Sequence, residues 1–216
     1  MKCVVTAGPT YETLDQVRRL TNFSTGQLGT ELANYLAAHG HEVTLLLGEP
    51  ATFAGERRAQ TVARFTTTEN LRDQLQALAA DKVDAVFHAA AVSDFKFGKV
   101  WLRSAAGELS EIKSGKISTR AGTLLAELVP TPKIIAELRA WYPTAKLIGW
   151  KYEVDGDRAG VLRVAEQQLT QCLTDACVAN GAAYGEGFGL VTGAGQCAHL
   201  ADRVALFEAL TGLLHS

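Results

Sequence analysis

The segment KCVVTAGPT, residues 2–10, joins a short apolar run to residues that break a strand. Its first part predicts a buried strand at residues 2–7, which Gly8, Pro9 and Thr10 end. Apolar side chains then recur at helical spacing over residues 25–38, and Gly40 follows where helices commonly stop. Residues 42–47 (EVTLLL) read as a second strand. This order predicts strands of a parallel sheet joined by a helix.

The same alternation continues along the chain. It predicts helices at residues 68–80, 131–141, 157–170 and 200–214, with Thr68 as the N-cap of the first, and strands at residues 84–91, 146–150 and 176–179. A hairpin is expected around residues 189–192. Together these elements predict a single α/β domain over residues 1–216, with a mainly parallel sheet covered on both faces and joined by right-handed crossovers.

Residues 93–128 interrupt this alternation. The stretch contains six lysines or arginines and four glycines, and it does not read as another strand and helix. We expect a β-hairpin or a mobile flap. Long excursions of this kind in compact domains commonly carry function.

Composition points to an ordinary globular protein. Of 216 residues, 47% are hydrophobic and 20% charged, and the net charge of -2 gives no sign of a nucleic-acid or membrane partner. The four cysteines form no CxxC pair, which favours buried free thiols in a reducing compartment. No signal peptide or membrane-length apolar run is apparent, so a cytoplasmic protein is expected.

Two turns are suited to binding a phosphate. TAGPT (residues 6–10) follows a strand, at the edge where open α/β sheets bind ligands, and its glycine lets a phosphate approach the backbone. NFSTG (residues 22–26) precedes a helix. Ser24 or Thr25 caps that helix, or the free N–H groups at its start bind an anion. Arg18 lies upstream and is available to pair with the same phosphate or with one across a dimer interface.

Two further segments offer charged side chains. In AAAVSDF (residues 89–95) the small residues leave room for a flat ligand, and Asp94 would accept from a ribose or base, help hold Mg²⁺, or simply cap the next element. In EIKSGKIS (residues 111–118) a flap lysine would close over a triphosphate, or the segment is a solvated charge run. Lys113 and Lys116 are both candidates.

Several common catalytic motifs are absent. The sequence has no GxGxxG or Walker loop, no GxSxG elbow and no HExxH, and no residues are predicted to form a metal site. His88 falls in a predicted strand and is interpreted as a core or rim residue.

Six motifs in order carry a family resemblance. They are TAGPT (6–10), DQVR (15–18) leading into NFSTG (22–26), AAVSDF (90–95), PTPKI (130–134), GWKYE (149–153) and VAN (178–180). In this order they resemble the phosphopantothenate–cysteine ligase family, the synthetase half of the coenzyme A biosynthesis flavoproteins. The resemblance runs from residue 2 to about residue 210. One departure is Gly181 after Asn180, where bacterial members of the family often have Asp-Val. The sequence shows no decarboxylase half, so a stand-alone synthetase is expected.

The resemblance implies a fold and a reaction. The fold would be a Rossmann-like three-layer α/β fold with a long flap excursion. The carboxylate of 4′-phosphopantothenate would attack the α-phosphorus of a nucleoside triphosphate and release pyrophosphate, and the amine of L-cysteine would then attack the acyl-nucleotide. CTP or ATP would be the co-substrate, with Mg²⁺, and a homodimer would complete the site.

The resemblance also implies roles for particular residues. Asn22 would hold the acyl intermediate, Lys116 would stabilise charge at the α-phosphate, and Trp150 would pack against the base. The implied nucleotide site is Gly8, Pro9, Thr10, Ala90, Ala91, Asp94, Lys116, Trp150 and Lys151. The implied phosphopantothenate site is Arg18, Asn22, Ser24, Thr25 and Gly26.

Some alternatives stay open. Lys116 is favoured over Lys113 because its spacing to Pro132 fits stand-alone members of the family. CTP is favoured over ATP, although the sequence does not decide between them. A non-catalytic nucleotide- or flavin-binding module of the same fold is the competing function, but such a module needs neither Asn22 nor a flap lysine.

Overall fold

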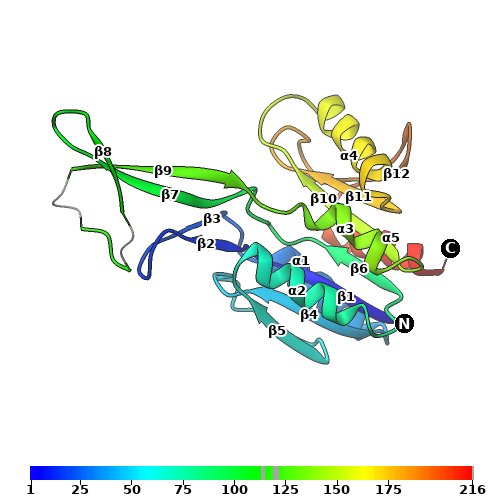
Figure 1. Cartoon of the computed structure of the whole chain (residues 1–216). Coiled ribbons are helices and arrows are strands. Elements are labelled where there is room, and N and C mark those ends of the chain that lie inside the picture. Colours follow the sequence, from blue (N-terminus) through cyan, green and yellow to red (C-terminus); the bar gives the residue numbers. More distant parts are fainter. Residues whose placement is uncertain (113–114, 119–121, 216) are drawn as a thin grey trace.

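The computed structural model describes residues 1–112, 115–118 and 122–215. At its centre lies an eight-stranded sheet in the order β13-β12-β11-β10-β6-β1-β4-β5 (Figure 1). These strands are β1 (Lys2–Ala7), β4 (Glu42–Gly48), β5 (Thr61–Phe65), β6 (Ala85–His88), β10 (Lys146–Tyr152), β11 (Ala176–Asn180), β12 (Phe188–Gly193) and β13 (Gln196–Leu200). Every neighbouring pair from β11 to β5 is parallel, and β12 is antiparallel to both of its neighbours. The predicted mainly parallel sheet is confirmed.

Helices cover both faces of this sheet (Figure 1). They are α1 (Gln27–Ala38), α2 (Thr68–Leu78), α3 (Ile134–Trp141), α4 (Arg158–Cys172) and α5 (Arg203–Gly212), which runs into a short 3-10 helix, η2 (Leu213–His215). On one face α1 and α5 bury Leu32 and Leu206, and on the other α2 and α3 bury Leu71 and Leu138. Helix α4 packs on β11 and β12 through a third apolar cluster. The three-layer arrangement expected of the fold is confirmed.

Several element boundaries differ from the predictions. Helix α2 is capped by Thr67, whose hydroxyl accepts from the N–H of Asn70, so the assignment of Thr68 as N-cap is wrong by one residue. Strand β5 was not predicted, since it is an edge strand with only Phe65 fully buried. The predicted hairpin exists, but residues 189–192 lie within β12 and its turn follows Gly193.

A second, smaller sheet occupies most of residues 93–128. Strands β7 (Phe95–Arg103), β8 (Leu109–Glu111) and β9 (Thr123–Pro130) pair antiparallel in the order β8-β7-β9 and extend away from the main sheet (Figure 1). We call this sheet the arm. It is one of the two forms expected for this stretch, and its mobility stays a prediction. Lys113 lies outside the described residues.

The arm is fastened to the turn of a hairpin made by β2 (Tyr11–Thr13) and β3 (Arg19–Thr21). The buried carboxylate of Asp15 in this turn accepts from the backbone N–H of Ile117 at 3.2 Å and from Arg18 Nε at 3.1 Å. Arg18 also donates to the carbonyl of Ile117 at 2.7 Å. The Arg18 guanidinium, helped by backbone N–H donors, holds the pKa of Asp15 well below its usual range. Asp15 therefore remains a carboxylate and keeps the two segments together.

Three of the four cysteines are buried, as predicted, but Cys197 on β13 is exposed, so the expectation of a buried thiol is wrong for that residue. Burial raises the pKa of Cys3 to about 11 and that of Cys177 to about 12, which keeps both as unreactive thiols near neutral pH. Within the described part of the chain, no helix is both long enough and apolar enough to cross a membrane.

Candidate active site

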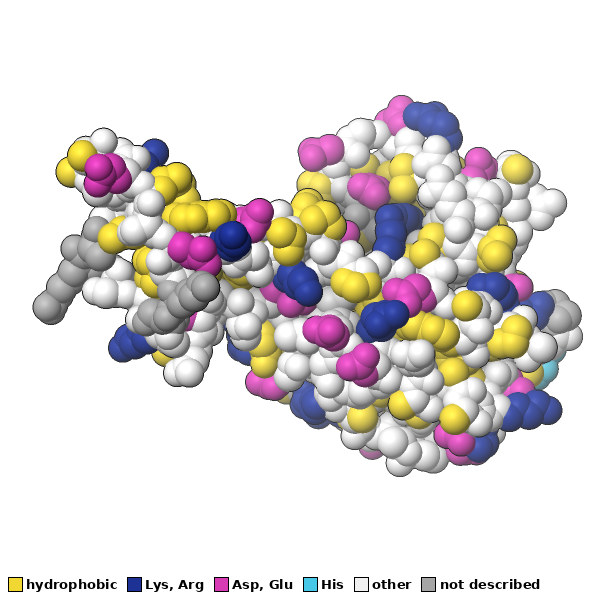
Figure 2. Space-filling view, viewed as in Figure 1, with side chains coloured by type: hydrophobic (Ala, Val, Ile, Leu, Met, Phe, Trp, Pro, Cys, Tyr) yellow, Lys and Arg dark blue, Asp and Glu magenta, His cyan; other side chains and the backbone are white. Residues whose placement is uncertain are grey.

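A cleft of about 970 Å³ opens at the carboxyl ends of β1, β6 and β10. The chain passes from β1 to β4 on one side and from β6 to β10 on the other, so β1 and β6 flank the point where the strand order reverses. Crevices at such points are the usual ligand sites of open α/β sheets. On the face seen in Figure 2, acidic and basic side chains are interspersed and no single charge dominates.

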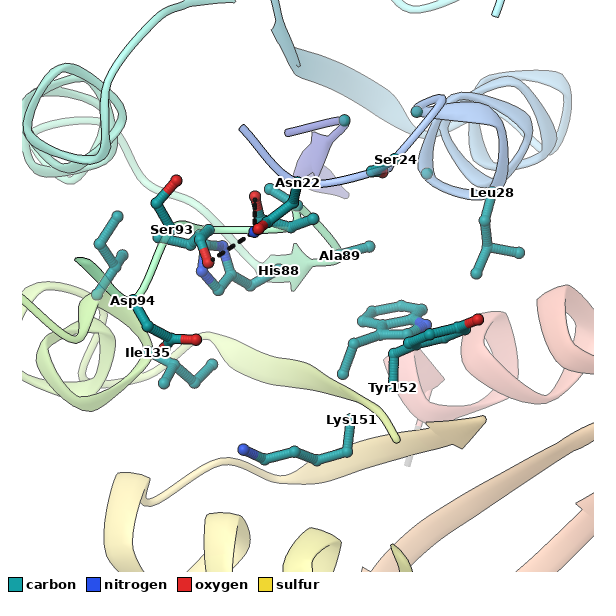
Figure 3. A pocket seen from close by; sticks show the side chains of 18 of the residues that line it. Asn22, Ser24, Leu28, His88, Ala89, Ser93, Asp94, Ile135, Lys151 and Tyr152 are labelled. Carbon is teal, nitrogen blue, oxygen red and sulfur yellow. Dashed lines mark hydrogen bonds between the residues drawn. The ribbon is translucent and has the colours of Figure 1, made fainter. Parts of the chain in front are cut away.

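One wall of the cleft is the segment that leads into α1. Asn22 donates through Nδ2 to the carbonyls of Ala91 and Val92, at 3.3 and 3.2 Å (Figure 3). This pair of bonds ties the NFSTG segment to the loop that follows β6. Asn22 and Ser24 lie across the cleft from Lys151 and Tyr152 (Figure 3).

The start of α1 is built for close approach. Gly26 is the N-cap residue, with φ of 78°, and no side chain caps the helix, so neither Ser24 nor Thr25 is its N-cap. Thr25 instead accepts from the N–H of Gln27 at 3.2 Å. Gly8 also has φ of 78°, and a Cβ would lie 2.8 Å from Ala51 Cβ at Gly8 and 3.0 Å from it at Gly26, which explains glycine at both turns. Free N–H groups and the positive end of the helix dipole thus border the cleft, as an anion site requires.

The loop after β6 forms the adjoining wall. Ala90, Ala91 and Asp94 line the cleft, and the carboxylate-bearing Asp94 is exposed. Thr10 lies behind them, fully buried: its hydroxyl donates to Ser93 Oγ at 3.0 Å and accepts from Ser93 N–H at 2.8 Å. Thr10 therefore positions the loop and does not reach the cavity.

The third wall is the end of β10. Trp150 and Lys151 both line the cleft, from opposite faces of the strand. The indole Nε1 of Trp150 is buried with no hydrogen-bond partner in the described chain, and so are Oε1 of Gln168 and Oδ1 of Asn180, which also line the cleft. Buried polar atoms are nearly always paired in folded proteins, so unpaired ones at a cleft indicate groups that a ligand satisfies.

Comparisons with known proteins agree with the motifs. Residues 1–203 match the family described as the DNA/pantothenate metabolism flavoprotein C-terminal domain. The chain belongs to this family. The resemblance inferred from the six motifs is thereby confirmed.

Relatives in this family are close in both sequence and shape. The coenzyme A biosynthesis bifunctional protein CoaBC of Thermococcus kodakarensis is 32% identical over 187 residues, which cover 83% of this chain and 41% of the relative. The chain thus spans about two fifths of the length of that curated relative. The structure of the DNA/pantothenate metabolism flavoprotein from Streptococcus pneumoniae matches with a TM-score of 0.86 and 27% identity, covering 100% of this chain and 98% of that one.

A more distant structural match carries a ligand. The Cab2 mutant H337A in complex with phosphopantothenate-cysteine matches with a TM-score of 0.70 and 18% identity, covering 100% of this chain and 89% of that one. At that identity the match supports the shared fold alone.

The cleft gathers most, but not all, of the predicted site residues. It is lined by Gly8, Asn22, Ser24, Thr25, Gly26, Ala90, Ala91, Asp94, Trp150 and Lys151. Pro9, Thr10, Arg18 and Lys116 are not among its lining residues. Arg18 binds Asp15 and Ile117 at the base of the arm, and Lys116 is exposed beside it.

Gln168 and Asn180 are among the lining residues that sequence reasoning did not place at the site, and His88 was underrated. Nothing in the sequence separates Gln168 from Gln167, because only the packing of α4 turns it toward β10. Asn180 ends the VAN motif, which was a usable signal. His88 was expected in the core or at its rim, and it is buried, yet it also borders the cleft.

Proposed function

We propose that this chain is a phosphopantothenate–cysteine ligase that acts in the cytoplasm. It joins 4′-phosphopantothenate and L-cysteine through an acyl-nucleotide intermediate in coenzyme A biosynthesis. The observation that carries the proposal is the meeting of the NFSTG segment, the AAVSDF loop and the GWKYE strand end around one cleft. Family membership supports the same reading, since relatives carry the name of coenzyme A biosynthesis proteins.

The walls of the cleft suit the two chemical steps. The α1 N-terminus, with Ser24, Thr25 and Gly26, binds a phosphate group by its free N–H donors. Asn22 holds the acyl intermediate by its amide oxygen, while its amide nitrogen stays bonded to the loop carbonyls. Because those bonds fix the amide in place, little ordering is needed when the amine of cysteine attacks.

The remaining walls suit the nucleotide. Ala90 and Ala91 leave room for the ribose and base, Asp94 accepts from the ribose, and Lys151 reaches the phosphates. CTP is the favoured co-substrate over ATP. Binding the triphosphate beside the α1 N-terminus and Lys151 lowers the cost of developing charge at the α-phosphorus.

Mg²⁺ fits this cleft as a companion of the triphosphate. Among the described residues, no group of three or more histidine, cysteine, aspartate or glutamate side chains could hold a metal ion by itself. Mg²⁺ commonly uses one or two carboxylates together with substrate phosphates and water, so Asp94 would suffice as its protein ligand. The ion would neutralise phosphate charge.

A homodimer completes the proposal. Arg18 and Lys116 stand outside the cleft of their own chain, next to the arm. Exposed apolar residues lie on the arm and beside it, among them Phe95, Leu125, Leu128 and Leu20, and hydrophobic side chains gather along the arm in Figure 2. Pairing of two arms would cover these side chains and bring Arg18 of one copy toward the cleft of the other.

Pyrophosphate release tests the proposal. The purified chain is given 4′-phosphopantothenate, Mg²⁺ and CTP or ATP, with and without L-cysteine, and both pyrophosphate and the amide product are measured. Release that depends on phosphopantothenate, and amide that also depends on cysteine, are expected. Tight nucleotide binding without pyrophosphate release would instead favour the non-catalytic binding module.

A further inference from the structure

The hydrogen bonds of Thr6 determine the tautomer of His88. Thr6 is fully buried on β1, and its hydroxyl oxygen lies 3.0 Å from Nδ1 of His88 and accepts from the N–H of Ala90 at 3.1 Å. The hydroxyl has one hydrogen and no further partner among the described residues. Only donation to Nδ1 satisfies that hydrogen, because a buried hydroxyl left without an acceptor is strongly disfavoured. The proton of neutral His88 is therefore on Nε2.

The Nε2–H group of His88 faces the cleft. The residue is 7% exposed and is one of the cleft-lining residues. Nε2 has no hydrogen-bond partner in residues 1–112, 115–118 and 122–215, and it is not one of the fully buried polar atoms. Burial lowers the pKa of His88 to about 4, so the ring is neutral near pH 7. The cleft thus contains a fixed, uncharged donor.

Gln168 supplies an acceptor on the same side of the sheet. It is 6% exposed, it lines the cleft, and its Oε1 is buried without a partner in the described chain. Its amide lies directly over Gly149, where a Cβ would fall 2.1 Å from Oε1, so this oxygen is covered as it stands and meets a ligand once the amide turns toward the cleft.

Strand register brings these two groups together. Val86 of β6 pairs with Leu147 of β10, and both pack in the cluster beneath α2 and α3. Side chains alternate along a strand, so His88 and Gly149, two residues further on, face that same side. Neighbouring strands lie about 4.8 Å apart, so the Gln168 amide over Gly149 is the neighbour of the His88 ring.

We propose that His88 and Gln168 read the amino edge of a nucleotide base. Gln168 Oε1 accepts from an exocyclic amine, and His88 Nε2–H donates to the adjacent ring nitrogen. This inference rests on the proposed function, in that a nucleoside triphosphate is the ligand. It makes the site selective for amino bases, cytosine or adenine, over the keto bases uracil and hypoxanthine.

The pattern of donors and acceptors excludes the alternatives. Uracil presents O4 and N3–H where cytosine presents N4–H and N3. Gln168 Oε1 would then face the acceptor O4, and His88 Nε2–H would face the donor N3–H. The Gln168 amide can turn over, but His88 cannot change tautomer without breaking its bond to Thr6. A phosphate is also a poor partner for these two groups, because a neutral donor gives it no charge and Oε1 repels it, so Lys151 is left to bind the phosphates. Leaving such buried groups mispaired is what produces strong discrimination.

The test measures base discrimination by the full chain. Calorimetry gives the Kd of CTP, UTP, ATP and ITP, each with Mg²⁺, and pyrophosphate release gives kcat/KM for the same four. The affinity and kcat/KM for CTP are expected to exceed those for UTP on the order of a hundredfold, and those for ATP should exceed those for ITP by a similar factor. In Gln168→Leu and in His88→Phe, CTP and UTP should differ by no more than about threefold, and so should ATP and ITP. The main cause should be weaker binding of the amino nucleotides, CTP and ATP.

Thr6→Val gives a signature that a merely structural role would not. Without the Thr6 hydroxyl, His88 is free to carry its proton on Nδ1 and accept the N3–H of uracil. UTP should then bind about tenfold more tightly than it does to the wild type, while CTP changes little. Thr30→Val is the matched control, since it removes from α1 a buried hydroxyl that has no partner among the described residues, and it should leave both ratios unchanged.

The outcomes separate this inference from the ligase proposal. Equal Kd values for CTP and UTP in the wild type, or an unchanged ratio in a folded Gln168→Leu chain, would overturn base reading by these residues, whether or not pyrophosphate is released. Selective binding without pyrophosphate release would overturn the ligase proposal alone. No binding of any of the four triphosphates would overturn both.

Discussion

Gly29→Ala tests how closely α1 packs against the sheet. A Cβ at Gly29 would lie 2.6 Å from Ala7 Cβ and 3.1 Å from the carbonyl oxygen of Thr6. Carbon atoms pack at about 3.5–4.0 Å, so α1 would have to retreat from β1 by roughly 1 Å. The strand cannot yield, because Ala7 is held in the parallel ladder with β4.

The size of the effect follows from two opposing contributions. Overpacking a well-packed core costs about 1–3 kcal/mol. Replacing glycine by alanine inside a helix returns about 1 kcal/mol. The expected net loss of stability is therefore at most about 2 kcal/mol, and for a chain of this size each kcal/mol lowers Tm by roughly 2–4 °C. Because the start of α1 would move away from the cleft, the affinity for CTP should fall as well.

Gly212→Ala is the matched control. Gly212 ends α5, and nothing lies within 4 Å of its ideal Cβ. The same substitution there should leave stability unchanged or raise it by up to about 1 kcal/mol. Urea denaturation of both variants, followed by calorimetry with CTP, makes the comparison. A Gly29→Ala chain as stable as Gly212→Ala would refute the close packing of α1 on β1, and with it the explanation for how the helix N-terminus is aimed.

Three further predictions concern the cleft and the arm. Asn22→Ala should leave the fold intact, accumulate the acyl-nucleotide and form no amide, so wild-type turnover of this variant would remove Asn22 from the mechanism. Lys116→Ala should lower the single-turnover rate on the order of a hundredfold, about 3 kcal/mol, with little loss of nucleotide affinity. Lys113→Ala should lower that rate far less. The reverse result would show that Lys113 is the flap lysine. Asp15 has a folded pKa below its unfolded value, so its stabilising contribution is present above about pH 4 and is lost as the pH falls through the folded pKa. The melting temperatures of wild type and Asp15→Asn should therefore differ at neutral pH and converge on acidification, and a constant difference would show that the Asp15 carboxylate does not fasten the arm.

The sequence predicted the central strands of the sheet well because each is a short apolar run that can be recognised from its own residues. Residues 3–7 are all buried and directly precede a glycine, so both the strand and its end are visible in the chain. Strand β5 gave no such signal, since its side chains are mostly exposed and its existence depends on pairing with β4. The three-residue strands β2 and β3 are likewise too short to show a period, and they are fixed by pairing with each other.

The site likewise has residues that can be predicted from their position in the chain and others that depend on tertiary packing. Asn22 precedes a predicted helix, Ala90 lies at the end of a predicted strand and Asp94 follows it, so topology alone brings them to one edge. Gln168 lies in the interior of α4 and enters the cleft only because Gly149 leaves a space above β10. Arg18 shows another limit of the sequence: within its own chain it is bonded to Asp15 and Ile117 and does not line the cleft, so its predicted phosphate contact now depends on the proposed dimer.

The two ends of the cleft differ in electrostatic character, and in the proposed complex this difference would give the nucleotide one orientation, with its triphosphate at the helix start where the resemblance implied phosphopantothenate. The end at α1 offers backbone N–H donors and a helix dipole, which favour a multiply charged phosphate chain. The end at β6 and α4 offers a neutral imidazole and an amide, which suit an uncharged planar base better than a phosphate, and Lys151 on β10 remains available to the phosphates. A reversed nucleotide would place phosphates against Gln168 Oε1 and leave the α1 N-terminus without an anion. With the base held at one end and the phosphates at the other, the α-phosphorus would lie between them, near Asn22, where the proposed mechanism requires the carboxylate of phosphopantothenate to attack.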